Sequence, residues 1–401
     1  MRVKRDVSRN LLTVILLVAL ISVVCVCVRV TSNLYEYRTQ TDEVIRDKEE
    51  QEEAYEELLL AYEGIQSENQ SLKEKVAELT DPGYGIKAYG QLKVKKGQLV
   101  SENGDKVLLR GLSSHGINWY PKYINAGALA TLKEYGANVF RIAMYTDENG
   151  GYVYETEQNK TYLYIAIENV LSQDMYAIVD WHILRDENPL RHIEEAKLFF
   201  EEISSHYSGN KGIIYEICNE PNGDTSWEDI CAYANQIIPI IRRNSPDAVI
   251  IVGTPHFSSQ LSEPMEKPLD YDNIMYTYHQ YIDVTKEAAN DFYQLNKAME
   301  NEFPVFVTEW GISYGDKDDT TINSCEDESL YMEQVHTFVE YLKANNISWC
   351  GWSLSNKAEG HSFVLNSCKK LSGWTKEDMT PSGWLMAQAL MYCKENSKTS
   401  E

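Results

Sequence analysis

Two apolar runs of this chain each carry a glutamate near their carboxyl end. The first, residues 213–220, is rich in β-branched side chains before it reaches Asn219 and Glu220. The second, residues 305–311, has the same form and contains Glu309. A carboxylate at the mouth of a buried strand is costly unless it has a partner or a task. The two runs therefore predict one site that holds two carboxylates.

Two convergent carboxylates suit the hydrolysis of a glycosidic bond. One must stay protonated to donate to the leaving oxygen, and the other must be ionised to attack or to activate water. Arg141, if it lies beside Glu309, would favour the ionised form, and the Tyr281 hydroxyl could orient it. Burial would raise the pKa of Glu220 if no cation lies near. The histidines lack HxH or HExxH spacing, so no metal or other cofactor is predicted.

Apolar, strand-like runs alternate with helical segments beyond residue 86. The runs are residues 107–112, 137–145, 176–182, 213–220, 249–255, 274–281, 305–311 and 347–354. Amphipathic segments such as 128–135, 193–207, 227–243 and 330–345 lie between them. Most runs are apolar on both faces, as parallel strands covered by helices should be. This alternation predicts an α/β fold, a (β/α)8 TIM barrel.

Polar and aromatic side chains collect at the carboxyl ends of these runs, where such barrels carry their sites. They are His115, Arg141, Tyr145, Asp180, His182, Asn219, Glu220, His279, Tyr281, Glu309 and Trp352. Any one of them is more simply explained as a buried polar residue that has found a partner. Their coincidence at one end of most runs favours a shared site.

A hairpin is expected before the first run of the barrel. Residues 98–100 and 107–109 are apolar and flank Asn103 and Gly104. Asn-Gly between apolar runs is a strong hairpin signal because both residues tolerate positive φ. The first strand of this hairpin is expected to cover one end of the barrel.

The bulk composition excludes several classes of function. The 401 residues carry a net charge of −24, which argues against a nucleic-acid partner. No GxxxxGK[ST] or GxGxxG string is present, which argues against nucleotide chemistry, and no CxxC pair suggests zinc or redox chemistry.

The first 30 residues have the form of a membrane signal anchor. Residues 11–28 are apolar and uncharged, and as a helix they would span about 27 Å, close to the thickness of a bilayer core. Basic residues precede the run and the chain turns acidic after it, which places the N-terminus in the cytoplasm and the rest outside the cell. The alternative is a cleaved signal peptide, but residues 24–28 offer no small-x-small cleavage site. We therefore expect a single-pass protein of the cell membrane with residues 1–30 as its cytoplasmic tip and transmembrane anchor.

Residues 31–80 are acidic and read as a helical stalk. A heptad seam runs through Tyr55, Leu58, Tyr62, Ile65, Asn69, Leu72, Val76 and Leu79. This spacing predicts a coiled coil that forms a parallel homodimer. A lone charged helix or a flexible acidic linker are the alternatives. Pro82 and Gly83 then mark a boundary, so residues 81–401 are expected to form the barrel domain.

Several strings in this chain resemble glycoside hydrolase family 5, in particular its bacterial endoglucanase (cellulase) branch. They are LRGLSSHG at 109–116, FRIAMY at 140–145, DWH at 180–182, NEP at 219–221, YHQY at 278–281, TEWG at 308–311 and WSLSNK at 352–357. They occur in the family's order and cover most of the chain beyond residue 90. The resemblance implies a retaining endo-β-1,4-glucanase whose partner is a β-glucan polysaccharide or oligosaccharide such as cellulose. Mannan, xylan or mixed-linkage glucan are the alternative substrates of the same mechanism.

The resemblance also implies roles for individual residues. Glu220 would be the acid/base and Glu309 the nucleophile. Asn219 would bind the 2-hydroxyl of the sugar at the cleavage site, and Arg141, His279 and Tyr281 would orient Glu309. The adjacent subsite would be lined by His115, Tyr145 and His182, with Trp352 as its stacking floor, and further sugars would be held by Trp119, Lys357 and Glu359.

The sequence departs from the family at two places near the expected leaving-group side. Residues 255–257 read Pro-His-Phe where the family usually has a tryptophan, and Ile282-Asp283 replaces a small Ala-Gly turn. Two other classes of function remain open at this point. A non-catalytic surface lectin would be expected to lack one of the two glutamates, and a scaffold protein would act through the stalk.

Overall fold

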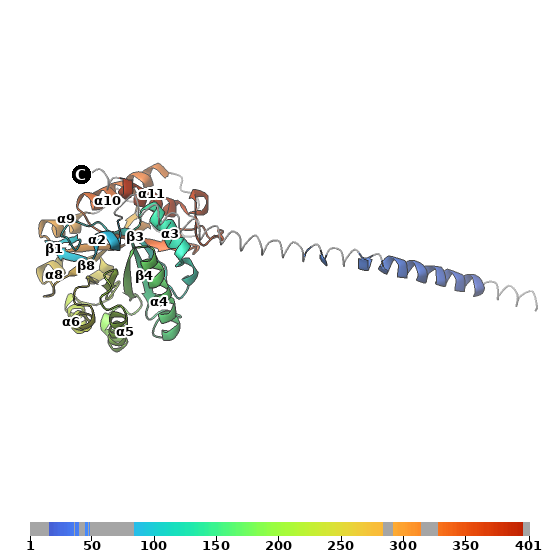
Figure 1. Ribbon diagram of the computed structural model, residues 1–401, viewed down its shortest axis with the longest axis horizontal. Helices are drawn as coiled ribbons and strands as arrows, with labels where there is room; N and C mark the ends of the chain where they lie inside the picture. The colour runs from blue at the N-terminus through green and yellow to red at the C-terminus, as the bar shows by residue number, and fades with distance from the viewer. Residues whose placement is uncertain are drawn as a thin grey trace, which may run out of the picture. The chain divides into compact units, whose positions relative to one another are not determined.

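The computed structural model describes residues 16–35, 37–39, 45–46, 48, 84–283, 292–313 and 328–395. The chain divides into two units, Met1–Asp81 and Pro82–Glu401. In the first, the helix Leu16–Thr39 contains an 18-residue window with a mean hydropathy of 2.1 and is long and apolar enough to cross a membrane (Figure 1). A signal sequence passes the same test. The predicted heptad seam, residues 55–79, lies outside the described residues.

The second unit contains a closed barrel of parallel strands, which confirms the predicted (β/α)8 architecture (Figure 1). The strand order around the barrel is β10-β3-β4-β5-β6-β7-β8-β9. The strands are β3 (Arg110–Ser114), β4 (Val139–Tyr145), β5 (Tyr176–His182), β6 (Ile213–Glu216), β7 (Ile250–Val252), β8 (Ile274–Asp283), β9 (Val305–Ser313) and β10 (Trp349–Leu354). Each predicted run overlaps one of them. β-branched and aromatic residues buried on both faces explain why these runs are strands.

Helices cover the outside of the barrel (Figure 1). They are α3 (Ala126–Tyr135), α4 (Thr156–Ser172), α5 (Ile193–His206), α6 (Trp227–Asn244), α8 (Ser262–Glu266), α9 (Tyr293–Glu300), α10 (Glu328–Ala344) and α11 (Pro381–Glu395). The short element α7 (Pro255–Ser258) follows β7 and contains residues with non-helical backbone angles. Local sequence sets some of their starts. Ser226 and Asp229 form a capping box at the start of α6, and the Asn125 side chain accepts from the Ala128 N–H at the start of α3.

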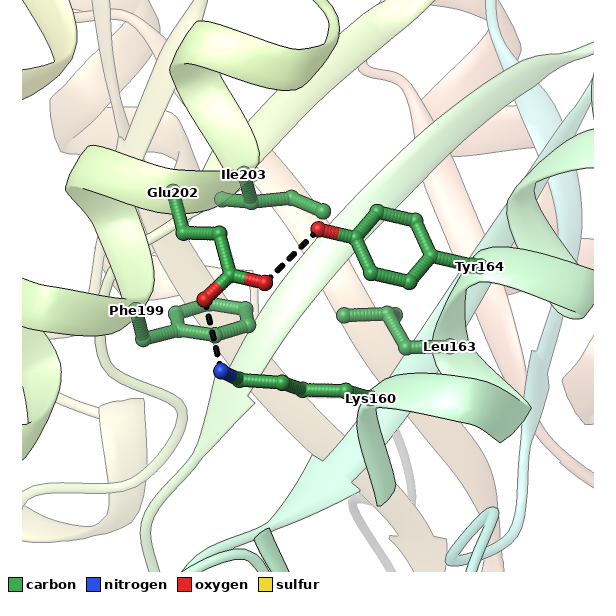
Figure 2. A pocket seen from close by; sticks show the side chains of 6 residues that line it. All are labelled: Lys160, Leu163, Tyr164, Phe199, Glu202 and Ile203. Carbon is green, nitrogen blue, oxygen red and sulfur yellow. Dashed lines mark hydrogen bonds and ion pairs between the residues drawn. The ribbon is translucent and has the colours of Figure 1, made fainter. Parts of the chain in front are cut away.

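The α4–α5 pair shows how the helices pack side by side (Figure 2). Leu163 of α4 faces Phe199 and Ile203 of α5 across a small gap. Above these apolar side chains, the carboxylate of Glu202 accepts from the Lys160 ammonium at 2.6 Å and from the Tyr164 hydroxyl at 3.0 Å. Exposed ion pairs contribute little to stability, so the apolar contact holds the pair together.

The base of the barrel is covered by a hairpin, but its turn differs from the predicted one. β1 (Lys93–Lys95) pairs antiparallel with β2 (Gln98–Val100). The turn between them uses Lys96 and Gly97, both with positive φ, which suits a two-residue hairpin. The predicted turn at residues 103–104 closes only an isolated bridge between Val100 and Lys106. β2 still covers one end of the barrel, as expected, because Leu99 packs into the cluster of strand residues at the barrel's base.

Strand β6 ends at Glu216, whereas the sequence predicts a strand through Glu220. The Ile217 N–H still donates to the Ile251 carbonyl of β7 at 2.9 Å, and the backbone after it lies along the end of β5. There the Asn219 N–H donates to the Trp181 carbonyl and the Glu220 N–H donates to the Ile183 carbonyl, each at 3.3 Å. Gly253, directly after β7, lies very close to this segment. A Cβ at this position would lie 2.2 Å from the Cys218 carbonyl oxygen, so the close approach requires a glycine. Glu220 therefore sits on an irregular segment rather than on a strand.

Candidate active site

The structure brings Glu220, His279 and Glu309 together at the carboxyl ends of the barrel strands. One side-chain ligand atom of each lies within 4.8 Å of those of the other two. Among the described residues this is the single group of His, Cys, Asp and Glu side chains spaced closely enough to hold a metal ion. The Glu309 carboxylate already receives hydrogen bonds from protein groups. The arrangement supports acid–base chemistry between two carboxylates directly.

Glu309 lies on β9, is buried, and is held by two donors. The Tyr281 hydroxyl donates to its Oε1 at 2.6 Å, and Arg141 Nη1 donates to its Oε2 at 3.2 Å. The predicted contacts of Arg141 and Tyr281 with Glu309 are therefore present. Burial raises the pKa of Glu309, while His279 and Arg141 act to lower it. Both hydrogen bonds are made to carboxylate oxygens, so they favour the ionised form.

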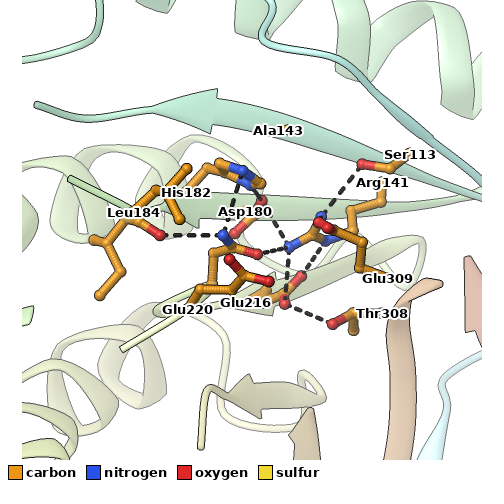
Figure 3. Close-up of polar contacts among 12 residues, drawn as sticks. Ser113, Arg141, Ala143, Asp180, His182, Leu184, Glu216, Glu220, Thr308 and Glu309 are labelled. Atoms are coloured by element: carbon orange, nitrogen blue, oxygen red, sulfur yellow. Dashed lines mark hydrogen bonds and ion pairs between the residues drawn. The ribbon is translucent and has the colours of Figure 1, made fainter. Parts of the chain in front are cut away.

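Arg141 is fully buried and contacts several acidic groups at once (Figure 3). Its Nε and Nη2 bind the two oxygens of Glu216 at 2.6 and 3.1 Å. Nη2 also lies 3.0 Å from Asp180 Oδ2 and donates to Asn219 Oδ1 at 2.6 Å. One guanidinium thus orders Glu309, Asn219 and two further carboxylates. The strongly raised pKa of Arg141 reflects these carboxylates acting against burial.

Glu216 was not among the site residues inferred from the sequence, although a signal was present. It is a carboxylate within an otherwise apolar run, and it is fully buried in the structure. A buried carboxylate needs a charged partner, and Arg141 is that partner. Asp180 is equally buried, and burial raises its pKa to about 7 against the lowering effect of Arg141.

Glu220 forms a hydrogen bond with His279. The distance between Glu220 Oε1 and His279 Nδ1 is 2.7 Å. Burial raises the pKa of Glu220 to about 7, Arg141 lowers it and Glu216 raises it further. Burial lowers the pKa of His279 to about 4, so the ring is neutral at pH 7. Glu220 can therefore hold a proton near neutrality.

The resemblance implies that His279 orients Glu309, and the structure shows the hydrogen bond of His279 with Glu220. His279 and Glu309 are neighbours across the β8–β9 ladder, but the imidazole bonds to Glu220 instead. The reason is the second ring nitrogen, Nε2, which lies 3.0 Å from the Thr308 hydroxyl oxygen. That contact turns the ring so that Nδ1 reaches Glu220.

Asn219 and His182 form a second polar unit beside the carboxylates. His182 Nδ1 lies 2.6 Å from Asp180 Oδ2, and His182 Nε2 lies 3.3 Å from Asn219 Nδ2. Asn219 Nδ2 also donates to the Ile183 carbonyl at 3.1 Å, while its oxygen accepts from Arg141. The amide of Asn219 is therefore engaged at both ends.

The other predicted site residues form an aromatic wall. His115 lies 5.3 Å from Trp352 and 6.2 Å from Tyr145, measured between ring centroids. Tyr145 also contacts His182 at 4.2 Å and Trp119 at 4.8 Å. Trp119 is 41% exposed, whereas the others are buried. Flat rings that gather at the edge of a polar site suit the faces of sugar rings.

Lys357 and Glu359 adjoin this wall. They form an ion pair with each other, and Glu359 Oε1 lies 3.7 Å from His115 Nε2. Two side chains with rings that contact site residues were not predicted from the sequence. Tyr120 lies 5.1 Å from His115, and His361 lies 5.1 Å from Tyr281. Neither follows a predicted strand run directly, so strand-end position gave no signal for them.

Residues 255–257, where the sequence departs from the family, have an unusual backbone. His256, Phe257 and Ser258 all have φ near +56°, with values of 56°, 57° and 55°. The Phe257 N–H donates to the carbonyl of Pro221, directly after Glu220, at 3.0 Å. The Phe257 side chain is 51% exposed. This left-handed turn thus presents an aromatic ring next to the segment that carries Glu220.

Comparisons with known proteins point to one family. The family model for cellulase (glycosyl hydrolase family 5) matches residues 100–358. Endoglucanase A of Butyrivibrio fibrisolvens is 42% identical over 76% of this chain and 69% of its own length. An endoglucanase of Clostridium saccharobutylicum is 39% identical over 78% of this chain and 67% of its own.

Solved structures agree with these relatives. The crystal structure of the catalytic domain of Thermobifida fusca endoglucanase Cel5A superposes with a TM-score of 0.69 at 31% identity, covering 77% of this chain and 99% of that domain. A variant of the same domain, solved with cellotetraose, superposes with a TM-score of 0.67 at 30% identity, over the same shares of the two chains.

Proposed function

Because the chain belongs to the cellulase family, glycosyl hydrolase family 5, and is an endoglucanase of that family, we propose that it is a retaining enzyme that cleaves internal β-1,4 bonds of cellulose or a related β-glucan. The observation that carries the retaining mechanism is the close approach of Glu220 and Glu309, whose nearest ligand atoms lie within 4.8 Å. Inverting enzymes keep their carboxyl groups roughly 6.5–9.5 Å apart to leave room for a water molecule.

In the proposed reaction Glu309 is the nucleophile and Glu220 the acid/base. Glu309 attacks the anomeric carbon, the glycosidic bond breaks, and the leaving oxygen takes the proton of Glu220. Glu220, now ionised, then removes a proton from water, which attacks the same carbon and releases Glu309. The two hydrogen bonds to Glu309 support its role as the ionised partner, and the raised pKa of Glu220 supports its role as the acid.

The remaining predicted site residues are proposed to hold the sugar chain. The wall formed by His115, Tyr145, His182 and Trp352 would pack on the sugar at the cleavage site, and Trp119, Lys357 and Glu359 would hold sugars further along. Asn219 would bind the 2-hydroxyl. Because both amide hydrogens of Asn219 already have partners, the sugar would displace the 3.3 Å contact with His182, the longest of them.

The substrate is tested by comparing defined oligosaccharides at equal chain length. We expect the highest kcat/KM on β-1,4-linked glucose oligomers and release of reducing ends from carboxymethylcellulose. Oligomers of mannan, xylan and mixed-linkage glucan serve as the comparison set. A higher kcat/KM on mannan or xylan oligomers would contradict the β-1,4-glucan assignment and leave the mechanism intact.

We further propose that residues 1–30 anchor the enzyme in the cell membrane as a single-pass protein with an extracellular barrel, and that residues 31–80 form a parallel coiled-coil stalk. The apolar helix Leu16–Thr39 supports the anchor, and the heptad spacing supports the stalk. We expect the full chain to sediment with membranes, and a chain that starts at residue 31 to sediment as a dimer in analytical ultracentrifugation. Mature protein that begins after residue 28 would contradict the anchor, and a monomer at high concentration would contradict the dimer.

A further inference from the structure

A line of hydrogen bonds connects the buried Glu216 to Glu220. Thr308 Oγ1 lies 2.8 Å from Glu216 Oε1 and 3.0 Å from His279 Nε2. His279 Nδ1 then lies 2.7 Å from Glu220 Oε1. Glu216 and Thr308 are fully buried, and the proposed reaction gives neither of them a step. The order of donors and acceptors along this line can be worked out from its buried end.

The buried end sets the direction of the first bond. Glu216 binds Arg141 through both carboxylate oxygens, which is the arrangement of an ionised carboxylate and a guanidinium. An ionised carboxylate can only accept hydrogen bonds. Thr308 must therefore donate its single hydroxyl hydrogen to Glu216. Thr308 Oγ1 is then an acceptor towards its other two neighbours, the Thr277 hydroxyl and His279 Nε2.

The second bond determines which ring nitrogen of His279 carries the hydrogen. Because Thr308 has no hydrogen left to give, His279 Nε2 must be the donor. Burial keeps the ring neutral, since it lowers the pKa of His279 to about 4. A neutral ring has one N–H, so Nδ1 carries a lone pair. This lone pair faces Glu220 Oε1, and the 2.7 Å contact is a hydrogen bond only when Glu220 is protonated.

We propose that Thr308 and Glu216 are positioning residues that hold His279 in the Nε2–H tautomer and thereby keep the acid proton on Glu220 before the reaction. The proposal rests on the assignment of Glu220 as the acid/base. It adds that the acid's protonation depends on a buried hydroxyl and a third carboxylate that do not touch the substrate.

The opposite tautomer would have the opposite effect on the acid. With the hydrogen on Nδ1, His279 would donate to the Glu220 carboxylate and stabilise its ionised form, which lowers the pKa of Glu220. Removing the Thr308 hydroxyl frees Nε2 from its acceptor and allows this tautomer. The other titratable groups that face the pair stay in place: Arg141 and Tyr145 from β4, Asp180 and His182 from β5, Glu216 from β6, Tyr281 from β8 and Glu309 from β9.

The test is the pH profile of kcat/KM, because this quantity reports the ionisation of the free enzyme. For the full-length Thr308→Val variant we expect the alkaline limb to move down by about one pH unit, the usual size of a shift caused by gaining one hydrogen bond to a carboxylate. Thr308→Ser, which keeps the hydroxyl, should restore the wild-type limb. Thr277→Val removes a buried hydroxyl one bond further from His279 and should leave the limb unmoved.

A merely structural role gives a different result. The proposal is overturned if Thr308→Val lowers the rate equally at every pH, or if Thr277→Val moves the limb as far as Thr308→Val does. Either of these results would overturn the proposal about Thr308 and Glu216. The acid/base assignment of Glu220 is tested separately, and a loss of activity in Glu220→Ala would still support it. Full activity in Glu220→Ala would overturn both the acid/base assignment and the proposal that rests on it.

A direct measurement of the tautomer does not depend on how the Thr308 variants fold. Nitrogen-15 NMR of histidine-labelled full-length wild-type protein distinguishes protonated from unprotonated ring nitrogens. We expect His279, identified by the signal lost in His279→Asn, to carry its hydrogen on Nε2. His182 should show the opposite tautomer, because its Nδ1 faces the Asp180 carboxylate. A His279 signal with hydrogen on Nδ1 would overturn the proposal.

Discussion

Replacing Glu309 by alanine is expected to lower kcat by a factor on the order of 10⁵, which is the scale of loss when a catalytic nucleophile is removed. The variant keeps Arg141 and Tyr281 but leaves them without the carboxylate they hold. The two other carboxylates that bind Arg141, Glu216 and Asp180, cannot take its place, because both are fully buried in those contacts. The measurement is the initial rate of reducing-end release from a β-1,4-glucan oligomer.

A control variant and a rescue experiment make this prediction specific. Glu300→Ala removes an exposed carboxylate from α9 and should keep the wild-type rate, since that side chain pairs only with Lys297 at the surface. Azide should enter the space left by Glu309→Ala and attack an activated aryl glycoside from the same face as the missing carboxylate. An α-glycosyl azide is the expected product. If Glu309→Ala keeps a rate near that of wild type, Glu309 is not the nucleophile.

Replacing Glu220 by alanine is expected to have an effect that depends on the leaving group. For a sugar leaving group, which needs a proton, we expect a loss of about 10³–10⁴-fold, near the upper range for general acid catalysis. For a dinitrophenyl leaving group, which departs without a proton, the rate constant of the first chemical step should be nearly unchanged. The comparison of the two substrates under single-turnover conditions is the measurement.

The pH profile gives a second check on Glu220. Burial raises the pKa of Glu220 to about 7, so the acid is protonated below that pH and loses its proton as the pH rises through it. Wild-type kcat/KM on sugar leaving groups should therefore fall above about pH 7, and this alkaline limb should be absent in Glu220→Ala. An equal loss on both leaving groups, with the limb retained, would assign the proton donation to another residue.

Much of the barrel follows from local pattern alone. Runs that are apolar on both faces are parallel strands wherever helices cover them, and each predicted run overlaps a strand. The carboxyl ends of parallel strands meet at one face, so residues such as Arg141 and Glu309 could be assigned to one site before their contacts were known. Their hydrogen bond at 3.2 Å agrees with that reasoning.

Two of the misses share one cause, which is that the deciding contact is made by a residue distant in the sequence. His279 was expected to orient Glu309 and lies beside it, but Thr308 on the neighbouring strand turns its ring towards Glu220. The strand predicted through Glu220 ends at Glu216, and the N–H groups of Asn219 and Glu220 bond to carbonyls at the end of β5 and just beyond it. The hairpin turn at Lys96 and Gly97 was missed because Lys-Gly is a weaker local signal than Asn-Gly.

The sequence by itself determined the class of fold, the face that carries the site and the two carboxylates, because strand periodicity and the cost of a buried charge are local properties. Only the tertiary structure shows which groups bind each carboxylate. These contacts depend on where one guanidinium, one phenol and one imidazole lie relative to Glu309 and Glu220, and these groups come from β4 and β8. A pKa is set by burial and by neighbours in space, so the proposed roles of the two glutamates depend on contacts that form only when the barrel closes.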